Sequence, residues 1–147
     1  MSLQAQTIFF EDLRVGMRES TRKHVSAADI AAFAEISGDR NPIHIDEAYA
    51  ATTPFGGCIA HGIFTAGLIS AAIATRLPGQ GTIYLGQSLR FVAPVRIGDE
   101  VVTSVEIIEL IARGRRAKLR CECKVGDTLV LEGEAEVKAP AKPAVQD

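Results

Sequence analysis

The residues best suited to chemistry gather in one short stretch, Ser37 to Asp46 (Ser-Gly-Asp-Arg-Asn-Pro-Ile-His-Ile-Asp). This stretch holds a carboxylate at Asp39, an amide at Asn41 and an imidazole at His44. An aspartate and a histidine near one water can divide acid and base roles, because histidine titrates near neutral pH and a carboxylate accepts or orients the proton. Spacing alone also fits a simpler interpretation, in which Asp39 and Asn41 build turns and His44 is a surface residue.

A second cluster, Gly56 to Gly62 (Gly-Gly-Cys-Ile-Ala-His-Gly), runs directly into a long apolar segment. If a helix begins here, its first N–H groups lack internal acceptors, and Gly62 could present its N–H to a carbonyl oxygen that gains negative charge. The alternative is that His61 and Gly62 only start the helix. Ser70, further along, would more often bond its own backbone four residues back than touch a ligand.

Two helices are expected to position these clusters. The first runs from Ser26 to Ser37, with Ser26 as its cap, Asp29 as the acid three residues on and Gly38 as its stop. The second covers 62–77, where residues are apolar almost all round, which is typical of a helix enclosed by its fold. Between them, 39–57 is rich in turn-forming residues and predicts a long functional loop with one helical turn.

After Pro78-Gly79 the pattern changes to four short β-rich runs separated by turn residues. These runs are Ile83 to Val92, Glu100 to Leu110, Arg116 to Val125 and Thr128 to Val137. The last two alternate apolar and charged residues, so one face of each strand is expected in the core. A three-residue loop, 125–127, would place Arg120 opposite Glu132 and Lys118 opposite Glu134.

One enclosed helix followed by an antiparallel meander predicts the α+β class, with a sheet wrapped around the helix, which is a hot-dog architecture. We expect one domain over 1–138. The tail, 139–147, carries two prolines among alanines and is predicted to be disordered.

Composition excludes several other classes of protein. The chain has 147 residues, 47% of them hydrophobic, and its 16 basic and 18 acidic residues are spread evenly, which gives no electrostatic signature of nucleic-acid binding. No apolar run reaches the ~18 residues of a membrane helix, and no secretory leader is recognisable at the start. The three cysteines fit neither a disulfide framework nor zinc spacing, so we expect a cytoplasmic protein with structural cysteines and no metal.

Three motifs together carry a resemblance to a known family. They are Gly38-Asp39-x-Asn41-Pro42-x-His44-x-Asp46, then Ile59-Ala60-His61-Gly62, then Phe91-x-x-Pro94-Val95-x-x-Gly98-Asp99. With them the chain resembles the MaoC-like, (R)-specific enoyl-CoA hydratases over roughly 25–137.

The resemblance implies syn addition of water to a trans-2-enoyl-CoA, giving the (R)-3-hydroxyacyl-CoA without metal or cofactor, in a homodimer or larger homo-oligomer with sites at the subunit interface. It implies that Asp39 and His44 are the catalytic pair. Asn41 and Ser70 would support them, and the Gly62 N–H would bind the thioester oxygen. Acyl length and physiological direction are not implied.

Two competing functions remain at this stage. A hot-dog thioesterase would direct water at the carbonyl carbon. Many such thioesterases share a carboxylate on the central helix, and residues 62–77 contain no Asp or Glu. A non-catalytic acyl-CoA-binding module would be expected to lack one of Asp39, Asn41 and His44, and all three are present.

Overall fold

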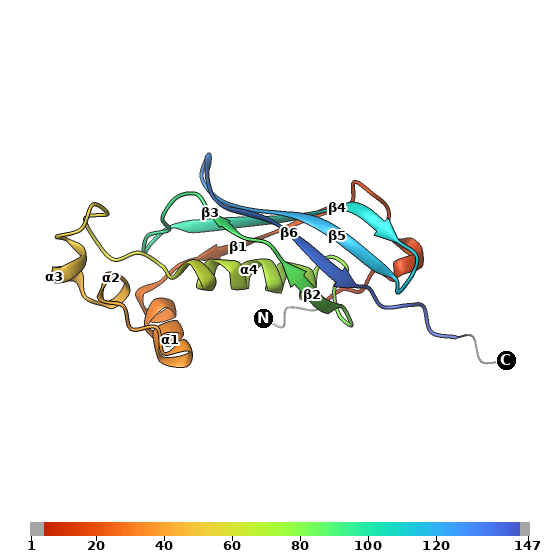
Figure 1. Cartoon of the computed structure of the whole chain (residues 1–147), viewed down its shortest axis with the longest axis horizontal. Coiled ribbons are helices and arrows are strands. Elements are labelled where there is room, and N and C mark those ends of the chain that lie inside the picture. Colours follow the sequence, from red (N-terminus) through yellow and green to blue (C-terminus); the bar gives the residue numbers. More distant parts are fainter. Residues whose placement is uncertain (1–4, 145–147) are drawn as a thin grey trace.

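A computed structural model, which describes residues 5–144, shows one antiparallel sheet curved over a single long helix (Figure 1). The helical elements are η1 (Phe10–Asp12), α1 (Ala27–Ser37), α2 (Pro42–Ile45), α3 (Glu47–Ala50) and α4 (Gly62–Thr75). The strands are β1 (Arg18–His24), β2 (Ile83–Gln87), β3 (Arg90–Phe91), β4 (Glu100–Ile111), β5 (Arg116–Val125) and β6 (Thr128–Lys138).

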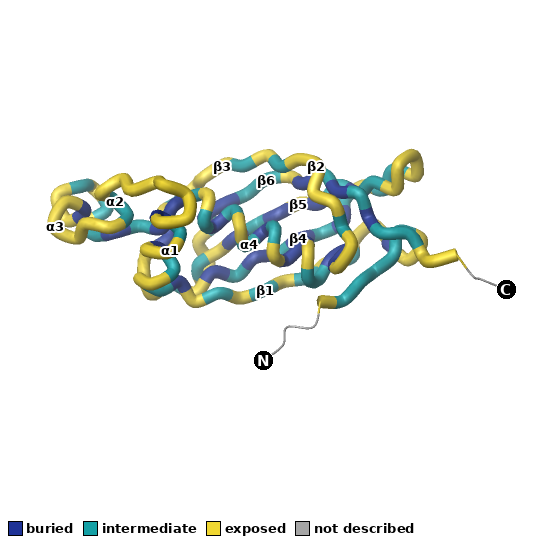
Figure 2. Tube along the Cα trace, turned by 90° about the horizontal axis from the view of Figure 1, so that it is seen from below, coloured by how far each residue is buried: buried dark blue, intermediate teal, exposed yellow. Residues whose placement is uncertain are grey.

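The sheet has the order β1-β4-β5-β6-β2, and the short β3 also pairs with β6. Every pairing is antiparallel. The helix α4 lies along one face of this sheet, while α1, α2 and α3 gather beyond one end of it (Figures 1 and 2). The predicted α+β hot-dog fold is confirmed.

The core lies between α4 and the sheet. Ile69, Ala72 and Ile73 of α4 are buried there, and so are four of the five residues that β5 was predicted to turn inward. These four are Ala117, Leu119, Cys121 and Cys123, whereas the fifth, Val125 at the end of the strand, is half-buried. Because this core packs α4 firmly against the sheet, the start of α4 has a fixed position, and so do the residues that directly precede it.

The outer side of α4 corrects the expectation of a fully enclosed helix. Ile63, Gly67, Ala71 and Ala74 recur along one side of α4 and are exposed, and that side faces away from the sheet (Figure 2). Residues 5–144 therefore leave an apolar stripe along α4 uncovered. The helix also ends at Thr75, two residues before the expected Leu77, which is buried next to Pro78.

The predicted register of β5 and β6 is wrong by two residues. Arg120 lies opposite Glu134 and Lys118 opposite Glu136, and Glu122 faces Glu132, a pairing of like charges. The turn has two residues between Val125 and Thr128 rather than three, and a register shift follows between positions 123 and 124. The shift restores the shared inner face, so the predicted faces hold although the pairs do not.

The expected single strand over 83–92 is divided into β2 and β3. Ser88 lies at the break: its N–H donates to the Glu134 carbonyl at 2.9 Å, and its hydroxyl accepts from the Glu134 N–H at 2.9 Å. A side chain thus takes one place in the ladder and interrupts the regular pairing. Gly86 marks a further register shift against β6.

The tail does not leave the domain at 139. Ala139 is buried, and the Pro140 carbonyl accepts from the N–H of Phe10 at 2.8 Å, so disorder is not found at these two positions. Residues 145–147 lie outside the described part of the chain. No helix within 5–144 is both long and apolar enough to span a membrane.

Candidate active site

A cavity of about 440 Å³ opens between the loop after α1, the start of α4 and the strands β3 and β6. Its walls are mostly apolar side chains, including Phe55, Ile63, Phe91, Val130 and Leu131. Three polar residues stand together in the same lining: Asp39, His44 and His61. An apolar pocket with a few converging polar groups is the usual form of a small-molecule site.

Asp39 is placed by the end of α1. The capping box of that helix is confirmed, since the Ser26 hydroxyl accepts from the Asp29 N–H and the Asp29 carboxylate accepts from the Ser26 N–H. Gly38 then turns the chain out of the helix with a φ of 78°, a conformation that glycine adopts without strain. The next residue, Asp39, is exposed, and its carboxylate accepts from the Asn41 N–H at 3.2 Å.

His44 lies on α2, the first of two short helices where one helical turn was expected. The Asn41 side chain caps α2 by accepting from the Ile43 N–H at 3.2 Å. The His44 Nδ1 lies 2.7 Å from the Ile59 carbonyl, which can only accept, so Nδ1 carries the hydrogen. That bond leaves Nε2 of His44 as the nitrogen able to meet a ligand. Asn41 therefore acts through loop geometry.

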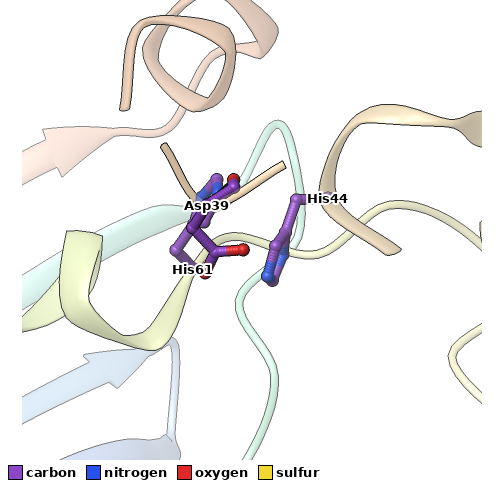
Figure 3. A group of neighbouring side chains, drawn as sticks. All are labelled: Asp39, His44 and His61. Carbon is purple, nitrogen blue, oxygen red and sulfur yellow. Dashed lines mark hydrogen bonds between the residues drawn. The ribbon is translucent and has the colours of Figure 1, made fainter. Parts of the chain in front are cut away.

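Asp39 and His44 come close enough to share one water molecule. One ligand atom from each of Asp39, His44 and His61 lies within 4.8 Å of the others. Two partners that each make a 2.8 Å hydrogen bond to the same water, at a tetrahedral angle, are about 4.6 Å apart. Figure 3 shows the Asp39 carboxylate directed toward the His44 ring. The predicted pairing of carboxylate and imidazole is present in the fold.

The start of α4 completes the polar end of the cavity. Gly62 is the first residue of α4 and lines the cavity, and the His61 side chain does not cap the helix. A Cβ on Gly62 would lie 2.5 to 3.0 Å from three atoms of the Phe91 ring, which is a severe overlap. With glycine here, the Phe91 ring lies close to the helix start without overlap, beside a first-turn N–H without an intrahelical acceptor.

His61 is the site residue that the sequence did not single out. It is only 2% exposed, its Nε2 donates to the Asp39 backbone carbonyl at 2.9 Å, and its ring stacks on His44 at a centroid distance of 3.9 Å. Phe33 of α1 packs against the same ring at 4.8 Å. Its motif position beside Gly62 was the available signal, but its contacts arise from elements that only folding brings together.

Ser70 does not lie in the cavity lining that the structure describes. It is half-buried on α4, eight residues beyond Gly62, which corresponds to about 12 Å along a helix. No side-chain hydrogen bond joins it to Asp39 within 5–144. Its supporting role stays a prediction.

Asp39, His44 and His61 have the residue types of metal ligands. Their ligand atoms spread over as much as 4.8 Å, whereas zinc bonds of 2.0–2.1 Å hold ligands about 3.3 Å apart. The two imidazoles also stack at 28°, so their in-plane lone pairs run side by side instead of meeting. The arrangement suits proton transfer better than metal binding.

Cys58, close to the site in sequence, is buried and unsuited to be a nucleophile. Burial, together with the nearby Glu47 carboxylate, raises the pKa of its thiol to about 11. Burial also raises the pKa of Cys121 to about 12 and that of Cys123 above its usual range. All three thiols are free and protonated at neutral pH, as expected of structural cysteines.

Comparison with known proteins identifies the family. The model of the MaoC like domain matches residues 13–134, which includes both the loop that carries Asp39 and His44 and the start of α4. The chain belongs to the MaoC-like domain family. The boundaries of the match leave out only the two ends of this MaoC-like chain.

Three similar proteins match this chain over most of both lengths. The chain is 58% identical over 139 residues to a 3-hydroxybutyryl-CoA dehydratase of Methylorubrum extorquens, covering 95% of this chain and 88% of that protein. It is 48% identical to an (R)-specific enoyl-CoA hydratase of Rhodospirillum rubrum, covering 91% and 93%. The unliganded R-hydratase PhaJ1 from Pseudomonas aeruginosa superimposes with a TM-score of 0.90 at 42% identity, covering 98% and 95%.

Proposed function

We propose that this MaoC-like protein is an (R)-specific enoyl-CoA hydratase, a hydro-lyase that adds water to a trans-2-enoyl-CoA and catalyses the reverse dehydration. The observation that carries the proposal is the convergence of Asp39 and His44 within 4.8 Å at the polar end of an apolar cavity. The high identity to proteins named as hydratase and dehydratase supports the same reaction.

The chemistry follows from the positions of these groups. Asp39 and His44 Nε2 hold one water, and its oxygen forms the new bond to C3 as a proton passes to one member of the pair. A proton then returns from the pair to C2, so that the elements of water are added across the double bond. Negative charge that develops on the thioester oxygen is stabilised by the Gly62 N–H.

We propose that protein groups alone carry out this reaction, with CoA present only as part of the substrate. Water addition to a conjugated thioester requires acid-base catalysis and charge stabilisation, and the site supplies both. Extensive dialysis against EDTA is expected to leave kcat unchanged. Loss of activity that returns on adding a divalent metal would contradict a metal-free site.

A four-carbon acyl group is the first substrate to test. The Methylorubrum extorquens relative, at 58% identity, is named for 3-hydroxybutyryl-CoA, whose dehydration product is a four-carbon enoyl-CoA. The apolar walls of the cavity suit an acyl chain. The Phe91 ring lies next to Gly62, the residue whose N–H would bind the thioester oxygen.

The decisive assay follows loss of the enoyl absorbance of crotonyl-CoA, with chiral analysis of the product and a parallel measurement of free thiol. A hydratase gives (R)-3-hydroxybutyryl-CoA with no thiol release. Thiol release without hydroxyacyl product would instead indicate a thioesterase. Tight binding of the acyl-CoA without either product would indicate a binding module.

We also propose that the protein works as a homodimer. β2 lies at an edge of the sheet, and its Ile83, Tyr84 and Leu85 are 55%, 39% and 51% exposed. An apolar edge strand with unpaired backbone groups is a template for pairing with another chain. The uncovered apolar stripe of α4 adds to this surface. A second copy, placed edge to edge along β2, would cover both by a twofold axis.

Light scattering during size-exclusion chromatography tests the dimer. The wild type is expected at twice the chain mass, and Leu85→Asp, which places a charge on the edge strand, is expected to shift the protein toward the monomer. Glu122→Gln, on the central strand β5, is a matched control that should remain dimeric. A wild type that runs as a monomer at micromolar concentration would contradict the proposal.

A further inference from the structure

A buried histidine joins the two residues of the proposed catalytic pair. The His61 Nε2 is 2.9 Å from the backbone carbonyl of Asp39, and the His61 ring stacks face to face on His44 with a centroid distance of 3.9 Å. The residue is 2% exposed, so these contacts are made in the interior, at the base of the cavity.

The hydrogen-bonding state of His61 follows from its partners. A carbonyl oxygen only accepts, so Nε2 must carry a hydrogen. The other nitrogen, Nδ1, is buried without a hydrogen-bond partner among the described residues. Buried polar atoms without partners are rare in folded proteins. Packing alone would be better served by an apolar ring, so the polar ring points to a role beyond packing.

The two residues that His61 contacts, Asp39 and His44, lie on other elements than His61 itself. Asp39 follows α1 and His44 belongs to α2, whereas His61 directly precedes Gly62 at the fixed start of α4. Phe33 of α1 packs on the His61 ring at 4.8 Å and completes the link. Besides His61, the loop is held by hydrogen bonds between neighbours in sequence, such as that from the Asn41 N–H to the Asp39 carboxylate, and by Ile59, whose carbonyl accepts from the His44 ring and whose N–H donates to the Ile43 carbonyl.

We infer that His61 is a positioning residue for the hydration reaction, which fixes the Asp39 backbone through one hydrogen bond and the His44 ring through one stacking contact. This inference rests on the proposed hydratase function. Through these two contacts, His61 fixes the positions of Asp39 and His44 relative to the start of α4, where the Gly62 N–H also lies. A misplacement of about 1 Å among groups that act together costs roughly a hundredfold in rate.

Two variants separate the two contacts. His61→Phe keeps an aromatic ring to stack on His44 and removes the donor to Asp39, while His61→Gln keeps a donor and removes the ring. Each is expected to lower kcat for crotonyl-CoA about 10- to 100-fold, with KM changed by less than about threefold. His61→Ala, which removes both contacts, is expected to lose more than either.

Thr103→Val is the matched control. Thr103 is 1% exposed on β4, and its hydroxyl lies 3.4 Å from the Cys123 sulfur, so the change removes a different buried polar group. It is expected to lower the melting temperature while kcat stays near the wild-type value. The split between kcat and KM, absent in this control, distinguishes positioning from general destabilisation.

A spectroscopic test needs no substrate. Nitrogen-15 NMR of the histidine-labelled wild type is expected to show the Nε2–H form at His61, and an Nδ1–H form would overturn the inference. Wild-type kcat in both His61→Phe and His61→Gln would overturn it as well. Failure of the wild type to hydrate crotonyl-CoA is a separate result, because it rejects the proposed function itself.

Discussion

The loop that carries Asp39 and His44 and the start of α4 contribute to the same candidate site by different means. In the loop, Asp39 is exposed and His44 half-buried, and several hydrogen bonds that shape it join residues two or three apart. At the start of α4, His61 is buried, and its contacts come from α1, α2 and the Asp39 backbone.

The difference separates reactive groups from the frame that holds them. Groups that bind water must reach the cavity, so they lie on a loop with little tertiary burial. A rigid start of α4, anchored by the core, supplies the frame and a helix N–H that needs no side chain. Substitutions in the loop should therefore remove chemistry without unfolding the protein, whereas substitutions at the frame should disturb geometry.

The largest effect is expected in the loop. Asp39→Asn removes the carboxylate and His44→Ala removes the imidazole of the proposed acid-base pair, and general acid-base groups usually contribute 100- to 10,000-fold. We expect kcat for crotonyl-CoA to fall by about that factor, with circular dichroism and oligomeric state unchanged. Near wild-type turnover in either variant would reject the roles assigned to the pair.

A smaller loss is expected at the frame. Gly62→Ala would place a Cβ 2.5 to 3.0 Å from the Phe91 ring, so either the ring or the helix start must shift. We expect kcat to fall about 10- to 100-fold, since the loss of an oxyanion donor costs about 100- to 1,000-fold and a displaced donor costs less.

The partner of Gly62 provides the control for this clash. Phe91→Leu replaces the ring by a smaller side chain. In the double variant Gly62→Ala/Phe91→Leu, the rise in activation free energy caused by Gly62→Ala is therefore expected to fall by more than half. Additive losses in kcat would mean that contact with Phe91 is not the reason for glycine at this position.

The helix that leads into the loop should affect stability more than chemistry. Ser26→Ala removes the hydroxyl that accepts from the Asp29 N–H, and loss of such a cap costs about 1 kcal/mol. We expect the free energy of unfolding in urea to fall by that amount, while kcat changes less than about twofold. A tenfold loss of kcat would show that α1 and the loop are coupled more tightly than the contacts indicate.

The same cap predicts a dependence of stability on pH. The backbone N–H of Ser26 and the Lys23 ammonium lower the pKa of Asp29 below its usual value. Because the pKa of Asp29 is lower in the folded than in the unfolded state, the ionised carboxylate stabilises the fold at pH values above the unfolded-state pKa. This stabilisation is lost as the pH falls through the folded-state pKa. The destabilisation caused by Asp29→Asn should therefore shrink between pH 6 and pH 3. Destabilisation that grows on acidification would contradict it.

The smallest effect is expected at the cysteines. Because burial and Glu47 raise the pKa of Cys58 to about 11, its thiol should be protonated and inert near neutral pH. The native protein is expected to show no rapidly modified thiol with a disulfide reagent at pH 7.5, and three after denaturation. Rapid modification of Cys58 with loss of activity would indicate an open path to the site.

The same division explains what could be predicted from the sequence. The capping box at Ser26 and the alternation of β5 depend on neighbours in sequence, and the structure confirms them. The predicted register of β5 and β6 was wrong because the turn has two residues instead of three. A register shift next to the turn then brings the apolar residues of both strands back to the same face. His61 was missed because its partners, Phe33 and His44, meet it only after folding.

The most direct measurement of the central claim is isotope tracing during turnover of crotonyl-CoA in water labelled with oxygen-18 and deuterium. If Asp39 and His44 deliver one water to the double bond, oxygen-18 must appear in the C3 hydroxyl and deuterium at C2, on the same face, with the thioester intact. Oxygen-18 in a free carboxylate, accompanied by released CoA, would contradict the account.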